Sequence, residues 1–150
     1  MKQIKALPKM VFDNRFTSEL LKHYHYAAFI SILDCDNFEE KFDKSISNFL
    51  QVKMWDIEAD VLENDVVKFD KPSETELQKI VDFINKQQDK STFIIHCSAG
   101  ISRSGAVATF LYDKFLTEID KEIFRRENKF IRPNLYILKR LKALDPEFTE

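Results

Sequence analysis

The residues best suited to chemistry lie in one short segment, CSAGISRSG, at positions 97–105. A cysteine thiolate is a strong nucleophile, and the planar guanidinium of arginine can bind two phosphate oxygens at once. Cys97 and Arg103 are separated by five residues, so a tight loop would bring both to the same anion. The segment therefore indicates phosphate chemistry, with Cys97 as nucleophile and Arg103 stabilising the transferred phosphoryl group.

The glycine content points to the same segment. The chain contains only Gly100 and Gly105, whereas an average content of about 7% would give roughly ten glycines. Glycine allows a positive φ or a close approach of the backbone to another group. We therefore expect both glycines to serve the geometry of a tight loop.

The sequence on either side of the loop predicts a strand before it and a helix after it. Thr92–Ile95 is a short β-branched and aromatic run, and Ala106–Phe115 is apolar on nearly every side. In a loop between a buried strand and a helix, successive N–H groups can turn inward and form an anion site, to which the helix adds its positive dipole end. The same field favours the thiolate form of a cysteine at the start of the loop.

The remaining sequence predicts a single α/β domain over residues 1–150. Strands are expected at Lys2–Leu7, Ala27–Leu33 and Gln51–Ile57, from their apolar or alternating patterns. Strands that alternate with helices favour a central, mostly parallel sheet of four to five strands flanked by helices. The loop at Cys97 then joins a central strand to a helix at the carboxyl edge of the sheet, where such sheets bind ligands. Further helices are expected at Ser18–Tyr26, Phe38–Leu50, Ser73–Gln88, Ile119–Asn128 and Asn134–Leu144.

Composition excludes several classes of protein. A formal net charge of -2 and a pI near 6.0 argue against a dedicated nucleic-acid binder. No apolar run approaches the roughly 20 residues that span a bilayer, and Met1–Met10 lacks the features of a signal peptide. Two cysteines cannot form a secreted disulfide framework. These features favour a cytoplasmic protein without membrane or nucleic-acid partners.

The spacing His96-Cys97, five residues, then Arg103-Ser104-Gly105 resembles the signature of the protein tyrosine phosphatase superfamily. The stretch Ala27–Leu144 is similar to the compact dual-specificity-like branch, including its small bacterial and phage-type members. Those members carry a similar GISRS loop and a Pro-Asn before the last helix, here Pro133-Asn134.

The resemblance implies a role for each residue of the loop. Cys97 would attack phosphorus and become phosphocysteine, and Ser104 would donate a hydrogen bond to the sulfur. His96 would brace the loop and help keep the thiol ionised. No metal or cofactor is implied, and phosphate, sulfate or vanadate would occupy the site as anions. The phosphate-binding residues would be Arg103 and the backbone amides of Ser98, Ala99, Gly100, Ile101, Ser102 and Arg103.

The resemblance also requires an aspartate that protonates the leaving oxygen, a step worth about two to four orders of magnitude in rate. Asp56, Asp60 and Asp65 are the candidates, and we favour Asp56 because it lies at the end of the predicted strand, beside a large apolar neighbour. Asp60 is the second choice. The distance in sequence from Asp56 to the nucleophile is longer than is usual for the branch. We attribute the extra length to Val61–Lys71, expected as a loop that covers or shapes the pocket.

Two classes of substrate and one non-enzymatic function fit these residues. The main hypothesis is hydrolysis of phosphotyrosine in proteins, with phosphoserine or phosphothreonine as further substrates. The alternatives are phosphoinositides or RNA 5′-phosphates, or a phosphate-binding module without catalysis. Relatives of the lipid type usually place lysine inside the loop, where this chain has only uncharged residues: Ser98, Ala99, Ile101 and Ser102.

Two further features have alternative interpretations. In some relatives a cysteine near the position of Cys35 can form a disulfide with the catalytic cysteine, which here would be Cys97. The simpler interpretation is a small buried residue at a strand end. Lys121–Lys142 carries eight basic and two acidic residues, with Arg132 nearest Pro133. It would either draw anionic substrates toward the pocket or form a solvated helical surface.

Overall fold

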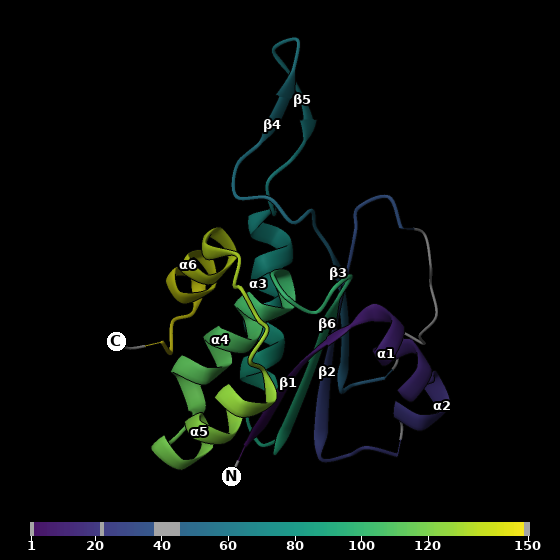
Figure 1. Cartoon of the computed structure of the whole chain (residues 1–150), viewed down its shortest axis with the longest axis vertical. Helices are drawn as coiled ribbons and strands as arrows, with labels where there is room; N and C mark the ends of the chain where they lie inside the picture. The colour runs from purple at the N-terminus through teal and green to yellow at the C-terminus, as the bar shows by residue number, and fades with distance from the viewer. Residues whose placement is uncertain (1, 22, 38–45, 149–150) are drawn as a thin grey trace.

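A parallel β-sheet forms the middle of three layers in the computed structural model, which describes residues 2–21, 23–37 and 46–148 (Figure 1). All neighbouring strands of this four-stranded sheet run parallel. The predicted α/β class and the predicted sheet of four to five strands are therefore confirmed. The strand order is β1 (Gln3–Pro8), β6 (Thr92–Cys97), β2 (Ala27–Leu33) and β3 (Phe49–Lys53).

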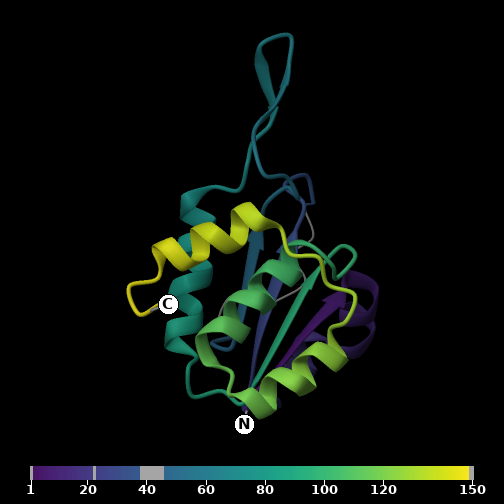
Figure 2. The same ribbon diagram turned by 60° about the vertical axis from the view of Figure 1, so that its left-hand side comes forward.

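Helices cover both faces of the sheet (Figures 1 and 2). Alternate residues of β2 explain this, because Ile30 and Ile32 enter one apolar core while Phe29 enters another on the opposite face. A strand that is buried on both faces has a continuous apolar sequence, as Ala27–Leu33 does. One face carries α3 (Glu74–Lys86), α4 (Arg103–Phe115), α5 (Glu118–Glu127) and α6 (Leu135–Leu144), and the other carries α1 (Lys9–Arg15) and α2 (Ser18–Leu21).

The second helix is shorter than the predicted Ser18–Tyr26. The buried side chain of Asn48 explains why the helix ends early. Its amide donates hydrogen bonds to the carbonyls of Leu21, Tyr24 and Ala27 at 3.4, 3.2 and 3.0 Å. The backbone therefore turns after α2 instead of continuing as a helix.

The structure moves the boundary between two predicted elements, the helix Phe38–Leu50 and the strand Gln51–Ile57. Residues 38–45 lie outside the described residues, and residues 47 and 48 form a turn. Phe49 and Leu50 belong to β3, where they pair with Phe29 and Ile30 of β2. Tertiary pairing with the central sheet therefore overrides the helical spacing, and β3 ends at Lys53 rather than at Ile57.

Helix α1 was not expected from the sequence. Pro8 ends β1 and stands at the N-cap of α1, with a φ of -66° that suits entry into a helix. Phe12 on this helix is fully buried against Phe16 and Phe29. Burying a phenylalanine stabilises the fold by about 1.5–3 kcal/mol, so α1 closes this face of the sheet despite its short length.

The segment Val61–Lys71, expected as a loop, is instead a β-hairpin that projects beyond the carboxyl ends of the sheet strands (Figures 1 and 2). Its strands β4 (Val61–Glu63) and β5 (Val66–Phe69) run antiparallel. Asn64 and Asp65 form a two-residue turn with φ values of 54° and 63°. Positive φ at both positions is the type I′ geometry that matches strand twist in tight hairpins.

Within the described ranges, no helix has the length and apolar character needed to cross a membrane.

Candidate active site

The loop after β6 packs tightly against the end of β1, and this contact requires glycine at position 100. Gly100 has a φ of +72°, and a Cβ atom there would lie 2.5 Å from the carbonyl carbon of Leu7 and from the nitrogen of Pro8. The carbonyl of Ser98 in the same loop accepts a hydrogen bond from the Lys9 amide at 3.1 Å. The loop is thereby held against the end of β1 and the start of α1.

The 131–134 segment holds the other side of the loop. The Arg132 amide donates to the Ile101 carbonyl at 2.9 Å, and the Asn134 amide donates to the Ser102 carbonyl at 3.0 Å. A Cβ atom at position 105 would lie only 3.2 Å from Cβ of Ile131, so glycine gives this segment room to approach. Gly105 does so without adopting a positive φ. The two glycines therefore serve the loop in different ways.

The hydrogen bonds described above use carbonyl groups of the loop, so its amide groups remain available to an anion. Among the residues that the structure describes, the N–H groups of residues 98–102 donate no backbone hydrogen bond. The N-terminus of α4 begins at Arg103 and adds its own unsatisfied amides and positive dipole end. This arrangement of backbone groups favours a bound anion such as phosphate.

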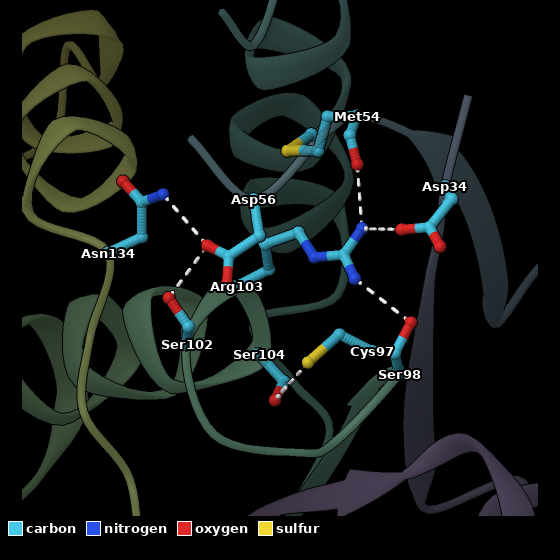
Figure 3. Close-up of polar contacts among 9 residues, drawn as sticks. All are labelled: Asp34, Met54, Asp56, Cys97, Ser98, Ser102, Arg103, Ser104 and Asn134. Carbon is cyan, nitrogen blue, oxygen red and sulfur yellow. Dashed lines mark hydrogen bonds and ion pairs between the residues drawn. The ribbon is translucent and has the colours of Figure 1, made fainter. Parts of the chain in front are cut away.

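The thiol of Cys97 lies at the base of this loop (Figure 3). Its side chain is 3% exposed, and its Sγ lies 3.1 Å from the Oγ of Ser104. Ser104 is fully buried in the first turn of α4. A hydroxyl at this distance can donate a hydrogen bond to the sulfur and stabilise negative charge on it.

The guanidinium of Arg103 extends across the loop and is 4% exposed (Figure 3). Its Nη1 donates to Oδ1 of Asp34 and to the carbonyl of Met54, both at 2.7 Å. Its Nη2 donates to Oγ of Ser98 at 3.0 Å. Nε is buried and has no hydrogen-bond partner within the described part of the chain. Because a buried donor needs a partner, Nε is suited to an oxygen of a bound anion.

Asp56, the favoured general acid, lies beside the loop. Its Oδ1 accepts hydrogen bonds from Oγ of Ser102 at 2.7 Å and from Nδ2 of Asn134 at 3.0 Å (Figure 3). Asn134 also caps α6 by accepting from the Ile137 amide at 3.0 Å. The carboxylate is therefore held by the phosphate loop and by the start of α6.

The other two candidate acids lie on the hairpin. Oδ1 of Asp60 accepts from the amide of Lys71 at 2.8 Å, which closes the base of the hairpin. Asp65 occupies the turn at the hairpin's end. Of the three candidates, Asp56 is the one that contacts the loop following Cys97.

His96, the residue before Cys97 on β6, contacts the neighbouring strand β2 and the helix α1. Its Nε2 lies 2.6 Å from Oγ of Ser31 on β2, and its ring centroid lies 4.3 Å from that of Phe12 on α1. Burial lowers the pKa of His96 to about 4, and a hydrogen bond with the Cys97 backbone only partly opposes that effect. At neutral pH the ring is therefore uncharged and adds no positive charge beside the thiol.

Four contacts of the site could not be read from the sequence: Asp34, the carbonyl of Met54, Ser31 and the side chain of Asn134. Each comes from an element far from the loop in sequence, such as Asp34, which lies 69 residues before Arg103. For two of these groups, the order of the strands provides a signal. Asp34 and Met54 directly follow β2 and β3, at the same carboxyl edge as Cys97.

The side chains of Cys35 and Arg132, which the sequence singled out, take no part in the contacts described above. Cys35, interpreted as a small buried residue, is exposed instead because it follows β2 in a surface turn. Both Cys35 and Cys97 are free thiols. Arg132 is exposed, and its backbone amide is the part that contacts the loop. No cluster of histidine, cysteine and carboxylate side chains suited to a metal occurs in the described ranges.

Comparison with known proteins agrees with this geometry. The family model described as protein-tyrosine phosphatase matches residues 11–125. The chain therefore belongs to the protein-tyrosine phosphatase family. No curated protein sequence matches the chain.

Solved structures of dual-specificity and related phosphatases share the fold. The chain is 19% identical to PTPMT1 in complex with PI(5)P, covering 95% of this chain and 89% of that one, with a TM-score of 0.53. Human DUSP28 is 13% identical over 95% of this chain and 90% of its own, with a TM-score of 0.53. DUSP15 is 16% identical over 95% and 83%, with a TM-score of 0.51. At these identities the likeness concerns the fold.

Proposed function

We propose that the chain is a cysteine-dependent phosphatase that hydrolyses phosphotyrosine in protein substrates, with phosphoserine or phosphothreonine as further substrates. The buried guanidinium of Arg103 is the observation that carries this proposal. Asp34 and Met54 hold its Nη1, while its Nε is buried without a partner among the described residues. A cation oriented in this way above a nucleophilic thiol is suited to a phosphoryl group.

In the first step, the thiolate of Cys97 attacks phosphorus, and the bond between phosphorus and the leaving oxygen breaks. Asp56 gives its proton to that oxygen, which departs as the alcohol or phenol. The loop amides and Arg103 bind the three phosphoryl oxygens throughout. Ser102 and Asn134 support this role of Asp56, because their hydrogen bonds hold its carboxylate beside the loop.

In the second step, water attacks the phosphocysteine and the bond between phosphorus and sulfur breaks. The Asp56 carboxylate takes a proton from the water, and inorganic phosphate leaves. Ser104 stabilises the departing thiolate, a role supported by the 3.1 Å separation of its Oγ from Cys97 Sγ. The loop and Arg103 supply the positive potential in both steps, so these residues need no metal ion for this chemistry.

Hydrolysis of p-nitrophenyl phosphate tests the proposal, in the presence of EDTA and from about pH 5 to about pH 8. Wild-type turnover that Cys97→Ser abolishes would support a thiol nucleophile, and trapping of phosphate on Cys97 would identify the intermediate. A folded, reduced wild-type protein that binds phosphate without turnover would indicate a phosphate-binding module instead.

Phosphoinositides are the second candidate class of substrate, because the solved complex of PTPMT1 contains PI(5)P. The loop of this chain presents only uncharged side chains at its variable positions, which weighs against highly phosphorylated headgroups. A parallel assay on phosphotyrosine peptides and on phosphoinositides separates the two classes. A higher kcat/KM on phosphoinositides would overturn the proposed protein substrate.

A further inference from the structure

The β4–β5 hairpin stands apart from the rest of the fold. It projects from the same edge of the molecule as the loop after β6 (Figures 1 and 2). Its strands pair only with each other among the strands described. A two-stranded hairpin without a third strand or a covering helix is marginally stable in water. An additional segment on its surface would therefore stabilise it.

Apolar side chains continue along the hairpin from its base toward its turn. Leu62 and Val67 face each other across the two strands, and after a register shift the next cross-strand pair toward the base is Val61 and Phe69. The ring of Phe69 packs edge-on against Trp55 with 5.0 Å between centroids. Trp55 directly precedes Asp56. We call Trp55, Phe69, Val67 and Leu62 the apolar strip.

The outer end of the apolar strip is open to solvent. Leu62 is 59% exposed and Val67 is 43% exposed. Grouped apolar side chains that remain exposed beside a functional site mark an interaction surface. Because the strip starts at Trp55, the residue before Asp56, a molecule lying on it would have one end close to the candidate acid.

The charge of the hairpin selects among the macromolecules that could lie on the strip. Between positions 60 and 71 four carboxylates outnumber two lysines, and one of these, Lys68, forms an ion pair with Glu63 at 2.8 Å. Net negative charge repels the anionic surface of a phosphoinositide membrane and the backbone of RNA, and it attracts a basic polypeptide. The four carboxylates of this segment are Asp60, Glu63, Asp65 and Asp70.

We propose that the hairpin is a docking arm for an extended segment of a protein substrate in which apolar and basic residues alternate. Successive side chains of an extended segment point to opposite faces. Its apolar side chains would pack on the apolar strip while its basic side chains reach the carboxylates at the hairpin's edges. This inference rests on the proposed function and adds to it the kind of sequence that surrounds the phosphorylated residue.

The structure offers variants that separate docking from chemistry. The double variant Leu62→Ser, Val67→Ser removes the exposed apolar contacts and touches no residue of the phosphate loop. Because Oδ1 of Asp60 accepts from the Lys71 amide at 2.8 Å, the hairpin can also be deleted by joining these two positions through a short glycine linker. Ile119→Ser is the matched control, since Ile119 is 74% exposed on α5.

The test compares two phosphotyrosine peptides and p-nitrophenyl phosphate. In one peptide lysine alternates with valine around the phosphotyrosine, and in the other glutamate alternates with serine. We expect the double variant to raise KM for the lysine–valine peptide by about tenfold, which corresponds to about 1.4 kcal/mol. Activity of the double variant on p-nitrophenyl phosphate and on the glutamate–serine peptide should stay within about twofold of wild type.

Binding of the unphosphorylated lysine–valine peptide, measured by fluorescence anisotropy, tests the arm independently of catalysis. We expect wild type and Ile119→Ser to bind it and the double variant to bind about tenfold more weakly. Equal binding by wild type and the double variant would overturn the inference. So would a hairpin deletion that impairs hydrolysis of phosphoinositide vesicles and leaves the peptide unaffected. Absence of turnover on every substrate would contradict the proposed function, while peptide binding would still decide the role of the arm.

Discussion

The carboxylate of Asp34, at the end of β2, lies 2.7 Å from Nη1 of Arg103, at the start of α4. The arginine side chain is 5% exposed and the aspartate side chain is 41% exposed. The pair therefore sits at the boundary between the phosphate loop and solvent. By occupying Nη1, Asp34 leaves Nε and Nη2 of Arg103 on the side of the loop, which makes Asp34 a positioning residue for the phosphate-binding cation.

Replacing Asp34 with asparagine should lower kcat/KM for p-nitrophenyl phosphate by about tenfold, because a charge-assisted hydrogen bond worth about 1.5–3 kcal/mol is weakened. Inhibition by vanadate should weaken in parallel, since the same guanidinium binds the anion. Asp36→Asn is the control, an exposed carboxylate in the same turn. Tighter vanadate binding with unchanged kcat would mean that Asp34 acts only by repelling anions.

Substitution of the two candidate acids should separate catalysis from hairpin structure. Asp56→Asn should lower kcat by about 10²–10⁴-fold with little change in KM, because a general acid acts in the transition state. Asp60→Asn should leave the pH–rate profile unchanged, because the Asp60 side chain closes the base of the hairpin. Complete pH–rate profiles of both variants provide the measurement. A larger loss in Asp60→Asn would assign the acid to the hairpin.

Gly100→Ala should disrupt the phosphate loop, whereas Gly105→Ala should have a much smaller effect. At position 100 the new methyl group meets backbone atoms of Leu7 and Pro8 at 2.5 Å, and φ is +72°. We expect a loss of about 1–3 kcal/mol in the free energy of unfolding together with a loss of phosphate binding. At position 105 the nearest atom is Cβ of Ile131 at 3.2 Å, which would have to move by a few tenths of an ångström, while alanine favours the helix. Urea unfolding and phosphate titration of both variants measure the contrast, and equal effects would contradict it.

Protonation of His96 should destabilise the fold in acid. Burial lowers the pKa of the folded-state ring to about 4 from an ordinary value of 6.5, so the unfolded chain binds the extra proton first. The contribution of about 3 kcal/mol is therefore fully present above about pH 6.5 and is lost as the pH falls toward 4. An NMR titration of the ring, with urea unfolding at each pH, measures this dependence. A ring that titrates near pH 6.5 in the folded protein would refute it.

The segment from Cys97 to Gly105 could be interpreted from sequence because its chemistry is local. Consecutive residues supply the nucleophile, the amides and the arginine, and the apolar runs on either side predict the strand and helix that hold them. The alternation of strands and helices likewise predicted the parallel sheet. The favoured position of Asp56 followed from the family pattern, and the structure adds its contacts with Ser102 and Asn134.

The hairpin and α1 were not predicted, because the residue pattern that encodes each of them is short. The strands of the hairpin are only three and four residues long, and their turn is Asn64-Asp65 rather than a glycine-containing pair. Pro8 reads as the end of a strand, and only the burial of Phe12 beneath the sheet stabilises a helix after it. In both cases the local pattern was too short to decide the structure.

The sequence by itself determined the reactive segment, because strand, loop and helix follow one another along the chain and each depends on neighbouring residues. Only the tertiary structure decided which distant groups complete the site. Parallel strands bring their carboxyl ends to one edge, so Asp34 and the carbonyl of Met54 meet Arg103 there although they lie 69 and 49 residues away. Such contacts depend on the order and register of strands, which no local pattern of residues specifies.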